Sequence, residues 1–219
     1  MSKKPKQNSK QHEIEFLKKE YTGIAKALGD LYYVILKVFH FYLLIAAFPF
    51  SIIAILYRGR ESSQGQEFKL FDMPQSIASL FLIISILGFL STLSMIHLRM
   101  EQILYARTIN CIRRYFYDLS KNKKKFAGYL SLPFTDEMPS FLEWGRSLFS
   151  QIIIMGVINS AYLYIGLLSL NIACYRIWII LLSLFLLSLH IGAYIFIAKR
   201  REKKYTVKCP KKPGENGNI

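Results

Sequence analysis

Four long stretches lack any Asp, Glu, Lys or Arg, and this feature constrains the fold more than any other. They are residues 38–57, 76–98, 149–170 and 177–198. A helix needs about 20 consecutive apolar residues to cross the hydrocarbon core of a bilayer. There, only a helix or a closed barrel satisfies its own backbone hydrogen bonds. The pattern therefore predicts an all-α integral membrane bundle of four transmembrane helices.

Basic residues are distributed unevenly among the segments that flank these stretches. The chain combines a formal net charge of +15 with 53% hydrophobic residues, a balance typical of membrane proteins, so no nucleic-acid partner is expected. Lys and Arg are dense in residues 1–30, in 99–148 and after Ala198, whereas 58–75 and 171–176 hold few. Because cytoplasmic segments carry the excess of Lys and Arg, both termini are expected in the cytosol. The predicted location is the bacterial cytoplasmic (inner) membrane.

Two segments continue the helical pattern of the first two spans into the cytosol. In residues 14–31 apolar side chains recur at spacings of three and four, as in a coiled-coil seam. Residues 98–117 place arginines on one half of a helix and large apolar side chains on the other. We expect a cytosolic helical layer over 13–37 and 99–148, with the seam paired either within one chain or between chains.

The two ends of the chain are polar and differ from the membrane domain in composition. Such segments bury too little apolar surface to fold, so both ends are expected to be disordered. Ser140 and Glu143 form an S-x-x-E capping box, which predicts that the third helix begins at Ser140. The expected boundaries are a basic arm over 1–12, the membrane domain over 13–205 and a tail over 206–219.

The basic face of the cytosolic layer is the first candidate site. Basic side chains next to a membrane bind anionic lipid headgroups at about 1 kcal/mol each. The same charges suit a phosphorylated ligand or a cytosolic protein partner. The candidate residues are Arg99, Arg107, Asn110, Arg113, Arg114, Lys123, Lys124 and Lys125.

Polar residues inside the spans give two alternatives. Asn159, Ser160 and His190 either line a path, which makes the protein an oligomeric channel or small transporter, or pack helices together. His40, His97 and His190 share the inner-leaflet half of the spans, where they are candidates for a metal or haem site or for a proton relay.

Motifs of enzymatic chemistry are not found in the sequence. It contains no G-x-S-x-G, H-E-x-x-H or Walker-type motif, so we expect neither an enzyme nor a cofactor. Cys111, Cys174 and Cys209 are far apart and odd in number, which favours free thiols over a disulfide framework or a zinc site.

Two runs carry a family resemblance. R-M-E-Q-I-L-Y-A-R-T-I-N-C-I-R-R-Y-F, after the second span, is similar to small uncharacterised bacterial multi-span proteins. E-Y-T-G-I-A-K-A-L, before the first span, resembles membrane effectors of the SLATT type, which are associated with nucleotide-signalling defence systems. That resemblance implies a ligand-gated oligomer that damages the host membrane. The leading hypothesis is a non-enzymatic, oligomerising effector or scaffold whose basic cytosolic helices bind a partner, anionic lipid or a phosphorylated ligand.

Overall fold

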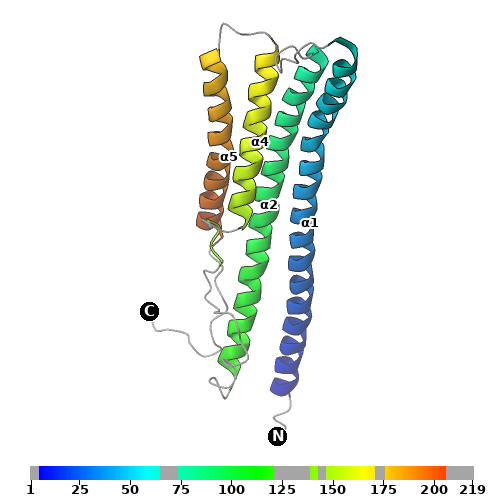
Figure 1. The fold of residues 1–219 in the computed structure, drawn as a ribbon. Coiled ribbons are helices and arrows are strands. Elements are labelled where there is room, and N and C mark those ends of the chain that lie inside the picture. Colours follow the sequence, from blue (N-terminus) through cyan, green and yellow to red (C-terminus); the bar gives the residue numbers. More distant parts are fainter. Residues whose placement is uncertain (1–4, 65–73, 121–138, 143–146, 171–175, 206–219) are drawn as a thin grey trace. The chain divides into compact units, whose positions relative to one another are not determined.

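The structure is a computed structural model that describes residues 5–64, 74–120, 139–142, 147–170 and 176–205 (Figure 1). These residues form four helices and no strand: α1 (Pro5–Gln64), α2 (Gln75–Leu119), α4 (Ser147–Ser169) and α5 (Arg176–Lys204). All four are long and apolar enough to cross a membrane. The predicted all-α fold with four helices of membrane-spanning length is therefore confirmed.

The chain folds as two compact units, which are described one at a time. Unit 1 comprises residues 1–34, 98–141 and 199–219, and unit 2 comprises 35–97 and 142–198. The division falls close to the predicted ends of the uncharged spans. Unit 2 therefore holds the apolar part of all four helices, and unit 1 holds most of the basic flanking sequence.

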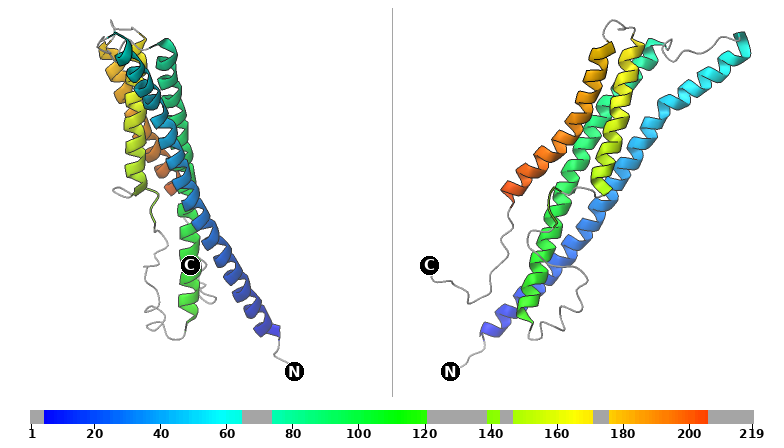
Figure 2. Two further views of the ribbon diagram at one scale, coloured as in Figure 1. Left: turned by 45° about the vertical axis from the view of Figure 1, so that its right-hand side comes forward. Right: turned by 60° about the vertical axis from the view of Figure 1, so that its left-hand side comes forward.

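In unit 2, α4 contacts each of the other three helices, and it lies beside α2 and α5 in Figures 1 and 2. Half of its most apolar window is buried, against 17% for α1 and 22% for α5. Gly166 permits the close approach of α2, because a Cβ there would lie 2.8 Å from Leu82 Cδ2 and 3.1 Å from the Ala78 carbonyl oxygen. The large faces that α1 and α5 leave exposed are apolar, as lipid contact requires.

Pro49 lies inside α1, and the helix continues through it. A proline has no N–H and weakens the hydrogen bonding of the preceding turn. One turn earlier, the Ala46 carbonyl accepts a hydrogen bond from the Tyr162 hydroxyl of α4. Phe50, Phe81 and Tyr162 pack their rings together next to this contact, with centroids 5.2–6.3 Å apart. A neighbouring helix thus supports the backbone where the proline interrupts it.

In unit 1, the first part of α1 and the last part of α2 belong to one compact body. The Tyr115 hydroxyl of α2 donates a hydrogen bond of 2.7 Å to the Glu13 carboxylate of α1. Residues of the predicted seam, such as Leu17 and Leu28, are half-buried, and Met100 and Ile103 of α2 are buried. Whether the seam pairs within one chain or between chains stays a prediction.

Three expectations about local structure are wrong. α1 begins at Pro5, so residues 5–12 are helical rather than a disordered arm. α4 begins at Ser147, and the predicted capping residue Ser140 lies in the non-helical segment 139–142. Cys111 is buried and disulfide-bonded rather than a free thiol, which the spacing of the cysteines did not indicate. The predicted tail over 206–219, Cys174 and Cys209 lie outside the described residues.

Candidate functional site

A polar junction joins all four helices in the middle of unit 2. Asn159 of α4 is fully buried. Its Oδ1 accepts a hydrogen bond of 2.7 Å from the Tyr42 hydroxyl of α1, and its Nδ2 lies 2.9 Å from His190 Nε2 of α5. Its backbone carbonyl accepts a hydrogen bond of 2.9 Å from Ser85 Oγ of α2. We call these four residues the Asn159 junction.

The contacts of His190 define the protonation of its ring. The amide nitrogen of Asn159 only donates, so His190 Nε2 must accept. The other ring nitrogen, Nδ1, lies 2.8 Å from the Leu186 carbonyl oxygen and therefore carries the hydrogen. The Phe89 ring meets the imidazole edge-on at a centroid distance of 5.0 Å. The junction is an uncharged network whose donors and acceptors are matched.

Glycines make room for this network. A Cβ at Gly88 of α2 would lie 2.6 Å from both Cγ and Nδ2 of Asn159, closer than non-bonded atoms approach. A Cβ at Gly156 of α4 would lie 3.3 Å from His190 Cβ. Close approach of helices through small residues is the usual way to seat polar groups inside a membrane bundle.

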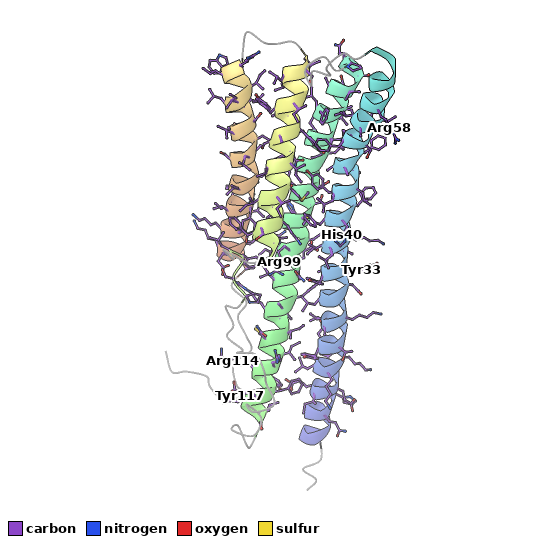
Figure 3. All side chains as sticks on the ribbon, viewed as in Figure 1. Tyr33, His40, Arg58, Arg99, Arg114 and Tyr117 are labelled. Atoms are coloured by element: carbon purple, nitrogen blue, oxygen red, sulfur yellow. The ribbon has the colours of Figure 1, made fainter. Side chains whose placement is uncertain are left out.

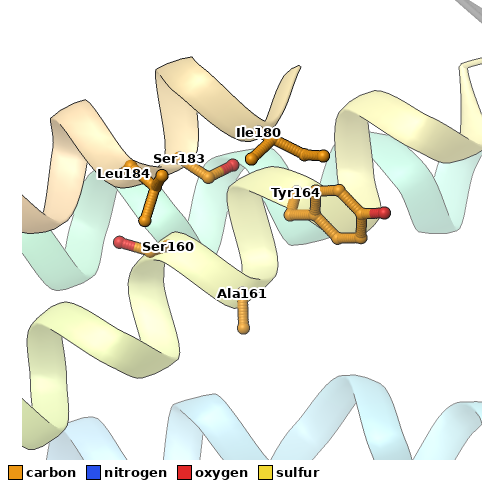
Figure 4. Close-up of a pocket in the computed structure, with 6 residues that line it drawn as sticks. All are labelled: Ser160, Ala161, Tyr164, Ile180, Ser183 and Leu184. Atoms are coloured by element: carbon orange, nitrogen blue, oxygen red, sulfur yellow. The ribbon is translucent and has the colours of Figure 1, made fainter. Parts of the chain in front are cut away.

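The three polar residues predicted to line a path or to pack helices behave differently from one another. The structure brings Asn159 and His190 together, and their polar side-chain atoms are used in contacts between helices. Hydrogen bonds of this kind hold helices together inside a membrane bundle. Ser160 is also buried, but its Oγ has no hydrogen-bond partner in the described chain. It lines a pocket of about 300 Å³ between α4 and α5 (Figure 4).

The histidines predicted as a metal or haem site are not brought together. His40 is exposed, His97 Nδ1 contacts the Leu93 carbonyl oxygen at 2.9 Å, and His190 belongs to the Asn159 junction. Among the described residues, no group of three or more His, Cys, Asp or Glu side chains could hold a metal ion. The metal interpretation therefore has no geometric support in this part of the chain.

Arg107 is the main surprise in unit 1. The sequence places it on the exposed basic face, yet only 2% of its side chain is exposed. Its Nη2 lies 2.6 Å from Glu202 Oε1, and its other nitrogens donate to the backbone carbonyls of Pro139 (3.0 Å) and Tyr205 (3.2 Å). The guanidinium also lies 4.4 Å from the centre of the Phe141 ring. Each of its three nitrogens therefore has a partner inside the chain, and the side chain is buried.

Glu202 completes this arrangement, which we call the Arg107 clasp. Its second oxygen, Oε2, accepts a hydrogen bond of 3.0 Å from the Phe141 backbone N–H. One carboxylate thus joins α2, the 139–142 segment and the end of α5. Charge-assisted hydrogen bonds of this kind are about twice as strong as neutral ones. The clasp contacts the backbone of the non-helical segment 139–142 at Pro139 and Phe141.

The remaining basic candidates lie in several environments. Arg99 and Arg114 are on α2 (Figure 3), where Arg99 Nη1 donates to Gln102 Oε1 at 2.5 Å and Arg114 is exposed. Asn110 and Arg113 are half-buried. The remaining members of the predicted set lie outside the described residues: Lys123, Lys124 and Lys125.

The structure adds residues that the sequence reasoning missed. Lys199, Arg200, Lys203 and Lys204 are exposed at the end of α5, directly after the last uncharged span. The run K-R-R-E-K-K is present in the sequence, but only its positive charge was used, to predict that the C-terminus lies in the cytosol. Tyr42 and Ser85 of the Asn159 junction carried no signal, because many similar residues occur in the spans.

A comparison with protein-family models, with curated proteins and with solved structures finds no match for this chain.

Proposed function

We propose that the chain is a non-enzymatic scaffold or effector of the bacterial inner membrane that self-associates and binds anionic lipid headgroups through basic residues of unit 1. Both termini then lie in the cytosol, as the distribution of Lys and Arg requires. The phosphate group is the shared chemistry of such headgroups and of phosphorylated ligands, and lipid is the source always present beside the helix.

The observation that carries this proposal is the exposed basic end of α5. Lys199 follows Ala198, the last residue of the uncharged span, so these side chains start where the apolar part of the helix ends. The only acidic residue of the run, Glu202, is paired with Arg107. The clasp thereby removes the internal acid from the basic run. Four exposed basic groups at headgroup depth contribute about 1 kcal/mol each toward anionic lipid.

Lipid selectivity tests this proposal. The protein is extracted from membranes of mixed phosphatidylethanolamine and phosphatidylglycerol, and the lipid that stays bound is measured by mass spectrometry. We expect phosphatidylglycerol to be enriched, and we expect the enrichment to disappear when Lys199, Arg200, Lys203 and Lys204 are replaced by Gln. The control is Arg58→Gln, which replaces an exposed basic residue directly after the uncharged span of α1. Unchanged enrichment in the fourfold variant contradicts the proposal. If the variant instead keeps its lipid and loses a cytosolic protein that the parent binds, the basic residues bind protein and not lipid.

Accessibility tests the orientation separately. In intact cells, a membrane-impermeant maleimide should label the Arg58→Cys variant, and it should label the Lys203→Cys variant only after lysis. The parent protein gives the background from its own cysteines. The reverse pattern contradicts the proposed orientation.

A further inference from the structure

The pocket between α4 and α5 contains a polar group with no partner. Ser160 is 9% exposed, and its Oγ makes no hydrogen bond within the described chain. Ser183 and Ser188 of α5 instead donate to the carbonyl four residues earlier in their helix. In Figure 4 the Ser160 hydroxyl lies beside Leu184 at one end of the pocket, and Tyr164 stands at the other. Ser160 therefore places a buried hydroxyl, unused within the described chain, in the wall of the pocket.

The surroundings limit what can fill this pocket. A hydroxyl in the hydrocarbon region has no water to bond, and an unpaired polar group there is costly. An acyl tail brings no acceptor, whereas a helix brings hydroxyl groups and backbone carbonyl oxygens. The pocket wall contains the small residues Ser160, Ala161 and Ser183, which allow a helix backbone to come close.

Helix α1 of a second copy has a suitable surface. The apolar window of α1 is the least buried of the four. Leu44, Ala47, Phe48 and Ser51 are all exposed at spacings of three and four, so they form one stripe. Ala47 and Ser51 are small and one turn apart, flanked by large side chains that fit on either side of a shallow pocket.

The depth of this stripe matches that of the pocket. The hydrogen bonds from Tyr42 to Asn159 and from Tyr162 to the Ala46 carbonyl align the two helices in the same direction. Ala47 therefore lies at about the level of the α4 residues that line the pocket. Copies inserted with one orientation share one depth, because the basic segments fix every copy in the same way. Ala47 of one copy thus meets the pocket of the next at the same depth, and Ser51 lies one turn beyond it.

We propose that unit 2 associates head to tail, with the Ala47–Ser51 stripe of one copy seated in the α4–α5 pocket of the next. There α1 supplies the acceptor for the Ser160 hydroxyl. The stripe and the pocket are different surfaces, so the contact is heterologous and extends around a ring or along a row. The inference deepens the self-association in the proposed function and is independent of lipid binding.

Cross-linking between differently tagged copies tests the geometry. One copy carries Ala47→Cys and the other carries Ala161→Cys, and the two are reconstituted together and oxidised. We expect a disulfide between the two tags, since Cβ atoms about 4 Å apart can be bridged. Val157→Cys, an exposed position of α4 outside the pocket, replaces Ala161→Cys in the control and should not cross-link. Two outcomes overturn the proposal. One is a disulfide between two Ala161→Cys copies, and the other is the absence of a disulfide between the Ala47→Cys copy and the Ala161→Cys copy.

Association measured by fluorescence transfer in liposomes tests the energetics. Ser160→Ala should weaken association about threefold to tenfold, the range for one hydrogen bond between membrane helices. Ala161→Leu, which fills the pocket from an exposed position, should abolish it, and Val157→Leu should not change it. The fourfold Gln variant of α5 should still cross-link, which separates this contact from lipid binding. A monomeric protein, or association unaffected by Ala161→Leu, overturns the proposal.

Discussion

Gly88→Ala should destabilise the protein only while Asn159 is present. The added Cβ would lie 2.6 Å from Cγ and Nδ2 of Asn159, so the carboxamide must rotate or α2 must move away. Rotation loses the bonds to Tyr42 and His190, each worth about 0.6 to 1.7 kcal/mol between membrane helices. Overpacking adds about 1–3 kcal/mol. The expected loss in free energy of unfolding is therefore about 2–6 kcal/mol.

A double-mutant cycle isolates this effect. The three atoms nearest the added Cβ all belong to the Asn159 side chain, and Asn159→Ala removes them. In that background Gly88→Ala should cost less than about 0.5 kcal/mol, so the coupling energy is about 2 kcal/mol or more. The assay is reversible unfolding in mixed micelles with increasing dodecyl sulfate. Gly192→Ala, where the added Cβ meets nothing within 4 Å, is the control. Additive costs of the two substitutions would refute the geometry of the junction.

Three further predictions concern single contacts. The hydrogen bond to Glu13 raises the pKa of Tyr115 to about 12. The stability that this hydrogen bond contributes is therefore present below pH 10 and is lost as the pH rises from 10 to 12. Glu13→Gln should lower the pKa of Tyr115 in a ¹³C NMR titration. Glu202→Gln should lower the melting temperature more than Arg107→Met. The first variant leaves the Arg107 guanidinium, which is 2% exposed, without its counter-ion, whereas the second leaves a Glu202 side chain that is 44% exposed and reached by water. The reverse order of melting temperatures contradicts the clasp. Tyr42→Phe should cost about 0.6 to 1.7 kcal/mol in the same unfolding assay, and the exposed Tyr164→Phe should cost nothing measurable; equal costs contradict the Tyr42 hydrogen bond.

The helices were the part of the structure that sequence reasoning could predict. Each predicted span matches one helix, the third running one residue past the end of α4, because uncharged length alone determines which segments can cross a bilayer. The continuation of the first two spans as unbroken helices also followed from periodicity, and it is present in α1 and α2. The position of these extensions in the cytosol remains a prediction.

The site residues were predicted less well, for physical reasons. Arg107 matches the polar half of its helix by periodicity, but burial also depends on what packs on that half. Its partner Glu202 comes from a segment far along the chain. Asn159 and His190 stood out because polar residues are costly in a membrane, whereas Tyr42 did not stand out among aromatic residues. Composition and spacing do not reveal which distant segments pair, such as Arg107 with Glu202 or Tyr42 with Asn159.

The Asn159 junction has a consequence for how the protein is made. Two of its members, Tyr42 and Ser85, are synthesised before Asn159, but His190 follows in the last helix. Until α5 emerges, the Asn159 Nδ2 group lacks its acceptor, and a lone carboxamide in hydrocarbon is costly. Entry of α4 and α5 into the bilayer as a pair avoids this state. A nascent chain stopped before Arg176 should therefore leave α4 loosely inserted, and completion of the last helix is the step that commits the bundle to its final arrangement.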